Sequence, residues 1–455
     1  MSAANRGDFG REFVHLNMLI TDWLVWFFLA IAIAFFIYAA TQPHWREPWQ
    51  RLLKNRIATI SIVILGFYFV LGLLDCVHFM QGSQLVSLLD LILKPLQHGD
   101  EKTYSAPFSL NLYSINDPQR LKYATSHLID ISQRPADIFK HVVIGFFEGL
   151  ISGLFIIVLL TALLSFIKKY SAKHSLSKLI RGKTINAWRP AVLVFLFIWV
   201  IIFICGNLAA YYHVLGTDKV GYDVLYQAVK SIRTGLLIGT LTTIFMLPLA
   251  IILGLAAGYF SGWPDDVIQY LYTTLSSIPG VLLISASVLV MQIYIAGHPE
   301  LFPSIAERAD ARLLALCFIL GITSWASLCR LLRAETLKLR ELEYIQAAQV
   351  LGVSRFAILW RHLLPNVLHI ILITIVLDFS GLVLAEAVLS YVGVGVDPTT
   401  LSWGNMINSS RLELAREPIV WWPLCAALVF MFGLVLSANL LSDALRDALD
   451  PRLKD

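Results

Sequence analysis

Two ionisable side chains inside a long apolar stretch are the first candidates for chemistry in this sequence. Asp378 and Glu386 are separated by about two helical turns, so a helix would place them on nearly the same face. A carboxyl group surrounded by lipid is costly, and such groups often belong to proton or ion pathways. Glu386 lies near one end of the stretch, where water or a neighbouring helix could satisfy it. The residues therefore leave two readings open, a packing contact and a direct contact with substrate or protons.

Motifs for catalysis by this chain alone are missing. A phosphate-binding loop needs glycine five residues before its Gly-Lys-Thr, because backbone N–H groups must surround the phosphates. The nearest match, Gly182-Lys183-Thr184, has Ser177 at that position and lies among basic residues. Histidines and cysteines are dispersed without metal-ligand spacing. The sequence predicts no catalytic site, no metal and no cofactor bound by this chain.

The composition indicates that lipid is the solvent for most of the chain. Of 455 residues, 57% are hydrophobic and only 15% are charged, whereas soluble domains carry roughly 25% charged residues. The net charge of +4 is small and spread along the chain, which argues against a nucleic-acid partner. An ordinary soluble enzyme is therefore excluded, and a lipid membrane is the expected environment.

Nine apolar stretches are long enough, or nearly so, to cross about 30 Å of hydrocarbon as helices. We therefore predict an all-α integral membrane protein, a polytopic bundle of about nine transmembrane helices. The stretches are 20–40, 57–75, 142–167, 190–212, 234–258, 270–296, 313–330, 369–391 and 418–441.

The basic residues of the loops predict the direction of these spans, because Lys and Arg concentrate on the cytoplasmic side. The segment 168–189 holds seven basic residues and no acidic one, and 41–56 and 330–366 are also predominantly basic. These three loops are expected in the cytoplasm. Loops 213–233, 298–312 and 392–417 are then exported, together with the segment that follows the span at 57–75.

The cytoplasmic loop between the seventh and eighth spans has the pattern of two helices joined by a sharp turn. Residues 335–351 favour helix, Gly352 is placed to end it, and Ser354 can cap the next helix toward Pro365. Small side chains on its surface, such as Ala347, would let a partner approach closely. A merely solvated connector is the alternative.

This loop resembles the EAA loop of ABC importer permeases, which typically reads E-A-A-x3-G-x9-I-x-L-P. The residues that carry the resemblance include Gln346 in place of the glutamate and His362 in place of the isoleucine, and glutamine keeps the size but loses the charge. The loop residues singled out are Glu343, Tyr344, Gln346, Ala347, Ala348, Gly352, Arg355, His362, Leu364 and Pro365.

Further motifs are similar to those of the second permease subunit of the dipeptide/oligopeptide importers. Residues 215–224 resemble L-G-T-D-x-x-G-R-D-V, with Tyr222 in place of arginine, and 256–265, 384–396, 402–406 and 445–452 also match. From these motifs we single out an external set consisting of Gly216, Thr217, Asp218, Gly221, Asp223, Trp403, Gly404 and Asn405.

The resemblance implies a six-span core of the type I ABC importer permease, with three further spans that are expected to be peripheral. The implied parts are an extra N-terminal helix (1–45), a first core span with a basic cytoplasmic lead-in (46–80), an inserted exported segment with a transmembrane hairpin (81–212), and the permease core (213–455) with its coupling loop (335–366).

The same resemblance implies the function of a transport subunit in the bacterial inner membrane, not an enzyme. Two cytoplasmic ATPase subunits would bind ATP and magnesium and dock on the EAA loop. An exported binding protein would deliver di- or oligopeptides, which would pass between this chain and a sister permease. The substrate itself cannot be read from the sequence.

Two other functions remain as alternatives. A proton-driven secondary transporter would use Asp378 and Glu386 but would leave the EAA loop unexplained. A membrane scaffold or sensor would use the additional spans, although the intact core motifs argue against it.

Overall fold

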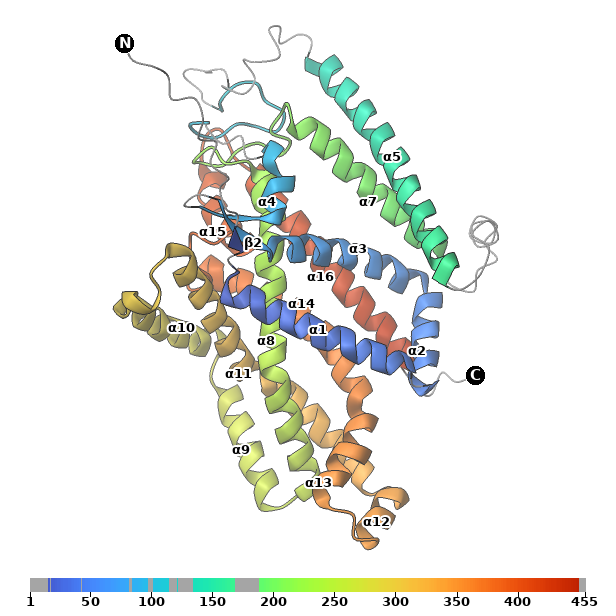
Figure 1. Ribbon diagram of the computed structural model, residues 1–455. Helices are drawn as coiled ribbons and strands as arrows, with labels where there is room; N and C mark the ends of the chain where they lie inside the picture. The colour runs from blue at the N-terminus through green and yellow to red at the C-terminus, as the bar shows by residue number, and fades with distance from the viewer. Residues whose placement is uncertain are drawn as a thin grey trace, which may run out of the picture.

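The computed structural model describes residues 15–16, 18–41, 43–81, 84–96, 101–113, 121, 134–167 and 188–449. Long helices dominate, and most of the apolar stretches follow them (Figure 1). The basic segment 168–187 and the end of the C-terminal motif, 450–452, lie outside the described residues. The helices are α1 (Ile20–Thr41), α2 (Pro43–Lys54), α3 (Arg56–Asp75), α4 (Leu88–Ile92), α5 (Arg134–Ile167), α7 (Trp188–Ala209), α8 (Val224–Phe260), α9 (Trp263–Ser277), α10 (Gly280–Gly297), α11 (Ile305–Arg340), α12 (Glu343–Val350), α13 (Arg355–Ile358), α14 (Leu364–Val392), α15 (Trp403–Ser410) and α16 (Trp422–Leu449).

Eight helical stretches among the described residues are long and apolar enough to cross a membrane. They correspond to α3, α5, α7, α8, α10, α11, α13 continued into α14, and α16; α1 contains a shorter apolar helix, Ile20–Phe35. Eight of the nine stretches predicted from the sequence each follow one helix, the stretch 270–296 is shared by two, and the prediction of an all-α polytopic membrane protein is confirmed.

Two predicted helix boundaries are wrong. The stretch 270–296 is divided between α9 and α10, because Ile278 precedes Pro279 and takes an extended conformation with φ −88° and ψ 131°. The helix predicted over 335–351 is interrupted after Arg340, and α12 begins at Glu343. The second interruption places the short helix α12 at the lower end of the molecule, whereas the first leaves α9 pointing toward that end and α10 about midway up the left side (Figure 1).

Local capping explains where several long helices begin and end. The side chain of Asn55 accepts from the first backbone N–H groups of α3, and Asp223 does the same for α8. Ser304 and Glu307 form a reciprocal capping box at the start of α11. Gly393 ends α14 in the left-handed conformation with φ 88°, which glycine adopts without a Cβ clash.

The long helices α8 and α11 form the centre of the molecule through close glycine contacts. A Cβ built on Gly254 would lie 2.8 Å from the Cβ of Leu332, and one on Gly258 would lie 2.5 Å from the Cβ of Thr336. Gly321 on α11 makes the reciprocal approach to Phe245 on α8. Small residues four apart let helix backbones meet closely in lipid, where packing replaces the hydrophobic effect as the attraction.

The hairpin of α5 and α7, at the edge of the molecule, is also held together by close glycine contacts. Gly145 and Gly149 on α5 approach the backbone of α7 so closely that a Cβ on either would lie within 3 Å of it. α7 in turn packs on α3, where the Phe67 ring lies 5.5 Å from that of Phe195 and 6.4 Å from that of Trp199. α5 is therefore the outer helix of the pair (Figure 1), and its outward side chains are apolar and exposed.

The extra helix α1 runs along the outside of the molecule with large exposed side chains such as Trp23 and Phe27, but its first turn is buried against the core. Asp22, at its first turn, is fully buried and accepts from the guanidinium of Arg233 on α8 at 2.6 Å. The backbone N–H of Thr21 donates to Asp310 on α11 at 3.1 Å. The cost of burying these charged groups is offset by pairing them, so α1 is anchored to both central helices.

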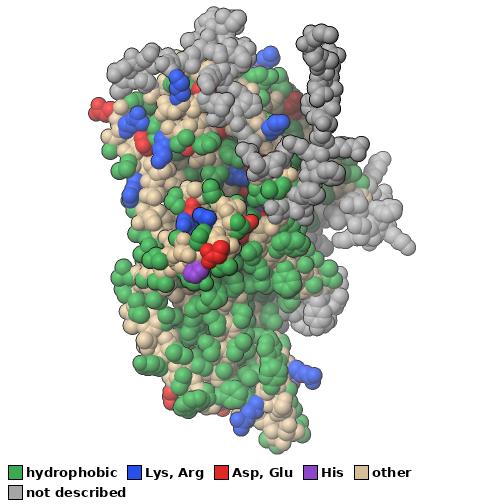
Figure 2. Space-filling view, turned by 60° about the vertical axis from the view of Figure 1, so that its left-hand side comes forward, with side chains coloured by type: hydrophobic (Ala, Val, Ile, Leu, Met, Phe, Trp, Pro, Cys, Tyr) green, Lys and Arg blue, Asp and Glu red, His purple; other side chains and the backbone are tan. Residues whose placement is uncertain are grey.

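Short strands and turns fill the end of the molecule opposite α12. The strands are β1 (His15–Leu16), β2 (His78–Gln81) and β3 (Gln84–Ser87), and they form an antiparallel sheet in the order β1-β2-β3. The apolar stretch 85–96, predicted to be too short to span, is divided among β3, α4 and the short 3-10 helix Lys94–Leu96. In Figure 2, charged side chains gather in the upper half of the visible face, and hydrophobic side chains cover the lower half down to a few charges at the tip.

The glycine contact between α8 and α11 predicts that Gly258→Val destabilises the protein. The added side chain collides with Thr336 and with the carbonyl of Arg333, and overpacking typically costs about 1–3 kcal/mol. Thermal unfolding in detergent measures this as a lower midpoint. Gly66→Val is the control, because no atom outside the adjoining backbone of its own helix lies within 4 Å of its Cβ position; equal shifts for both variants would contradict the prediction.

Candidate functional site

The predicted EAA loop forms a helical turn at one end of the molecule. After α12, Gly352 takes φ +75° in the left-handed region and turns the chain sharply. Ser354 caps α13 by accepting from the backbone N–H of Ala357 at 3.3 Å. α13 continues through a π-helical turn (Leu359–Leu363) into α14, so the chain passes Pro365 without ending the helix.

One side of this turn is packed into the membrane helices. Ile345 of α12 and Ile358 of α13 are fully buried, and Ala348 and Leu363 are buried beside them. They share a hydrophobic cluster with Tyr259 of α8 and with residues of α9, α11 and α14. Ala348, one of the small side chains predicted to lie on the surface of this loop, therefore belongs to this core, whereas His362 and Leu364 are half-buried.

The opposite side of the turn is exposed and apolar at its tip. Val350 is 88% exposed, Leu351 82% and Phe356 70%. We call these three side chains the apolar tip. Sequence reasoning missed them, although three large apolar residues within a polar loop were a usable signal. The predicted loop residues Glu343, Tyr344, Gln346, Ala347, Gly352, Arg355 and Pro365 are also exposed.

Hydrogen bonds tie the two helices of the turn to their surroundings. The Gln346 amide donates to the carbonyl of Glu341 at 3.2 Å. The residue that replaces the family glutamate therefore links α12 to the C-terminal end of α11 by a hydrogen bond. The amide of Asn366 donates to the Tyr344 hydroxyl at 3.1 Å, which links α12 to the start of α14.

An ion pair that the sequence analysis did not single out holds α9 against α11 at this end. The guanidinium of Arg333 donates to both oxygens of Asp265, at 2.5 and 2.6 Å. These hydrogen bonds hold the pKa of Asp265 below its ordinary value, despite the opposing effect of burial. The bidentate geometry fixes orientation as well as distance.

At the other end of the molecule, the first part of the external motif set is covered by the inserted segment. The backbone N–H of Ser105 donates to the Thr217 hydroxyl at 2.6 Å, and the N–H of Thr217 donates to the Ser105 carbonyl at 3.1 Å. A Cβ on Gly216 or Gly221, both at positive φ, would collide with the backbone of residues 101–105. The Trp422 indole donates to the Thr217 carbonyl at 2.9 Å, which joins this cover to α16.

The two aspartates of this motif hold the turn that leads into α8. Asp218 accepts from the backbone N–H groups of Val220 and Tyr222, each at 2.9 Å. Asp223 caps α8 and lies 2.8 Å from Nδ1 of His213. Tyr222, which replaces the family arginine, points outward and is 55% exposed.

The second part of the external set anchors α15 between α8 and α14. The buried Trp403 indole donates to the Ala228 carbonyl at 3.0 Å. A Cβ on Gly404 would lie 2.6 Å from the Cβ of Ser390, so only glycine fits there without displacement. The Asn405 amide donates to the carbonyls of Asp397 and Thr400, each at 2.9 Å.

The two intramembrane acids have different surroundings. Glu386 is buried and accepts from the Ser390 hydroxyl at 2.6 Å, one turn further along α14. Asp378 is half-buried, and the structure gives it no hydrogen-bond or ion-pair partner within the described part of the chain. The two side chains share a helix but no hydrogen bond joins them.

These features define a multi-pass membrane subunit with a rigid cover at one end and an exposed helical turn at the other. Residues 250–455 match the family described as "Binding-protein-dependent transport system inner membrane component". The chain is 33% identical over 243 residues to the glutathione transport system permease protein GsiD of Pectobacterium atrosepticum, covering 53% of this chain and 73% of that protein. It is 32% identical over 239 residues to the oligopeptide transport system permease protein OppC of Mycobacterium tuberculosis, covering 52% of this chain and 76% of that protein. Against OppC of Bacillus subtilis the identity is 29% over 243 residues.

The chain belongs to the family of binding-protein-dependent transport permeases. It is a permease subunit of an ABC importer and a multi-pass protein of the bacterial inner membrane. Proteins of this family are transport components, so the chain is a transport subunit and not an ATPase.

The pairing of Asp265 with Arg333 predicts a pH-dependent contribution to stability. Asp265→Asn should lower the free energy of unfolding by about 1.5–3 kcal/mol at pH 7, the range for hydrogen bonds to charged groups. Because the folded-state pKa of Asp265 lies below its unfolded value, this contribution is present above about pH 4 and is lost as the pH falls further. Unfolding midpoints of wild type and variant in detergent should therefore converge at low pH. A constant difference down to pH 3 would contradict this origin.

Proposed function

We propose that this chain couples ATP hydrolysis to peptide import through the helical turn of α12 and α13. The observation that carries the proposal is the apolar tip, in which Val350, Leu351 and Phe356 project from an otherwise packed turn. Large apolar side chains exposed together, with polar residues around them, are typical of a protein contact. The proposed contact is a cleft on a cytoplasmic ATPase subunit, which binds the ATP and magnesium.

The packing of the turn supports a mechanical role. Ile345 and Ile358 lie in one cluster with side chains of α8, α11 and α14. Because a close-packed core transmits displacement, a push on the apolar tip would move the ends of these helices. The bidentate Asp265–Arg333 pair would carry the same displacement to α9.

The orientation follows from the loop charges, with the α12 end in the cytoplasm and the α15 end outside. Under this proposal an exported binding protein docks at the α15 end, and a sister permease completes the path. Two relatives are a glutathione and an oligopeptide transport permease, which supports peptides as the substrate class. The parts would remain those predicted: an extra helix to residue 45, a first core span to 80, an insertion to 212, and the permease core from 213.

For the intramembrane acids we propose different roles. Glu386 stabilises the junction of α14 and α15, since Ser390 pairs with it and Gly404 packs over it. Asp378 has no such partner and is proposed to face the transport path. The family relationship gives no support to a proton-driven carrier.

The docking proposal predicts that Leu351→Asp abolishes coupling. Leu351 is 82% exposed, so the change leaves folding intact, but a carboxylate in an apolar contact is strongly unfavourable. We expect at least a tenfold loss of ATP-dependent uptake and of substrate-stimulated ATP hydrolysis in proteoliposomes that contain the complete transporter.

Leu351→Met is the matched control, because it keeps an apolar side chain of similar size at the same exposed position. Its uptake and ATP hydrolysis should remain near wild type if an apolar contact at this position is what couples the two subunits. Wild-type uptake by Leu351→Asp would refute the docking assignment.

A further inference from the structure

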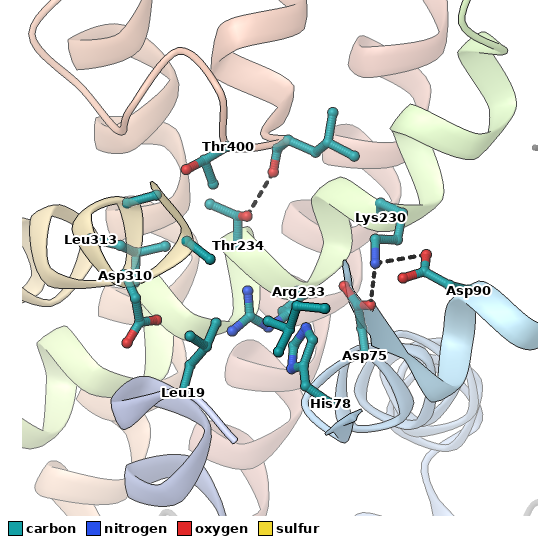
Figure 3. Close-up of a pocket in the computed structure, with 14 residues that line it drawn as sticks. Leu19, Asp75, His78, Asp90, Lys230, Arg233, Thr234, Asp310, Leu313 and Thr400 are labelled. Atoms are coloured by element: carbon teal, nitrogen blue, oxygen red, sulfur yellow. Dashed lines mark hydrogen bonds and ion pairs between the residues drawn. The ribbon is translucent and has the colours of Figure 1, made fainter. Parts of the chain in front are cut away.

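A charged cavity lies where α1, the inserted segment and the core helices meet at the α15 end of the molecule. Its volume is about 230 Å³. Core helices α8 and α11 supply part of the wall, the end of α3 and residues 400–401 supply another part, and α1's lead-in, β2, β3 and α4 supply the rest (Figure 3). The lining residues that the argument uses are Asp75, His78, Asp90, Lys230, Arg233 and Asp310.

Most of the charges around the cavity are already paired. The Nζ atom of Lys230 lies 2.6 Å from Oδ1 of Asp75 and 2.9 Å from Oδ1 of Asp90, so one ammonium group forms ion pairs with two carboxylates. Burial opposes ionisation of Asp90, but Lys230 holds its pKa below the ordinary value, so it stays charged. Arg233 pairs with Asp22, which also lies 2.8 Å from Nδ1 of His78.

Asp310 on α11 differs from the other carboxylates. Its contacts are with the backbone N–H and the hydroxyl of Thr21, and the described residues place no cation in an ion pair with it. A carboxylate has about four acceptor positions, so Asp310 can accept further hydrogen bonds beside the two from Thr21. Asp310 is only 6% exposed and lies across the cavity from Lys230 (Figure 3).

Carboxylates outnumber permanent cations around the cavity. Asp75, Asp90 and Asp310 line the cavity together with the permanent cations Lys230 and Arg233, and Arg233 is also paired with Asp22, which is not part of the lining. The group that balances this excess is a cation, and it fits beside the carboxylate that lacks one.

The walls next to Asp310 restrict the size of that cation. Ala306, Ala309 and Leu313 of α11 and Leu401 provide short apolar surface, and Thr234 donates its hydroxyl to the Leu401 carbonyl at 2.6 Å. The cavity is smaller than the 300–1,000 Å³ that encloses a whole drug-sized ligand. It therefore suits an ammonium group with one small neighbouring side chain, not a long peptide.

We propose that this cavity receives the N-terminal ammonium group of a peptide substrate, with Asp310 as its carboxylate contact. This inference rests on the peptide-import function proposed above and adds a site at which the permease itself distinguishes substrates. Because α1 and the inserted segment complete the cavity, it also gives these additional parts of the chain a role in substrate recognition.

The test is equilibrium binding of trialanine and N-acetyl-trialanine to the purified permease–ATPase complex in nanodiscs, without the binding protein. Wild type should bind trialanine at least tenfold more tightly, because acetylation removes the positive charge. Asp310→Asn should reduce this ratio to below about twofold. Thr21→Val is the matched control: it removes the hydroxyl contact to Asp310 but keeps the carboxylate, and it should retain the preference.

A second variant guards against a general effect of Asp310→Asn on folding. Ala309→Leu fills the cavity without changing any charge and should weaken trialanine binding at least tenfold. Absence of a preference in wild type, a preference that survives Asp310→Asn, or unchanged binding by Ala309→Leu would each overturn the inference. Loss of the preference in Thr21→Val would also overturn it, since Asp310 would then act only as an anchor for α1.

Uptake assays separate this inference from the proposed function. ATP-dependent uptake of trialanine by the complete wild-type transporter tests import itself. Uptake without a preference for the free ammonium group refutes the cavity assignment alone, whereas absence of ATP-dependent uptake refutes peptide import.

Discussion

The close contact between α8 and α11 is the constraint on which the rest of the structure depends. Gly254, Gly258 and Gly321 remove the side chains that would otherwise hold the two backbones apart. In lipid, apolar surface alone does not drive helices together, so this approach supplies the packing that water would otherwise enforce. Helices α9, α14 and α1 are then positioned by contacts to one or both of these two.

This central pair connects the two ends of the molecule. At the α12 end, Arg333 lies next to the contact of Gly258 with α11, and its ion pair with Asp265 holds α9. The buried face of α12 packs onto the same two central helices. At the α15 end, Arg233 and Asp310 extend from the pair into the charged cavity. A packed helix pair with the proposed docking surface at one end and the proposed ligand cavity at the other would be a physical basis for coupling.

The additional parts of the chain are of two kinds. The hairpin of α5 and α7 packs on α3 at the edge and presents apolar side chains outward, as a lipid-facing element would. In contrast, α1 and the inserted segment contribute buried polar contacts, at Asp22 and at Ser105. Segments that supply partners for buried charges cannot be removed without leaving those charges unpaired.

The sequence by itself determined the solvent, the positions of the helices and the family. These follow from local information: an uninterrupted apolar stretch must be helical in lipid because every backbone group needs an internal partner, and the motif at 346–365 is contiguous. Gly352 and Ser354 were predicted correctly for the same reason, since turns and caps depend on neighbouring residues. The division of 270–296 was missed even though Pro279 was a local signal.

Only the tertiary structure decided which charges meet. Asp22 and Arg233 are 211 positions apart, and Thr21 and Asp310 are 289 apart, so no pattern along the chain could pair them. The same holds for the apolar tip, where Ile345 and Leu351 look alike in the sequence but one is buried and the other exposed. Burial and pairing are properties of how helices pack, and that packing is set by contacts between distant parts of the chain.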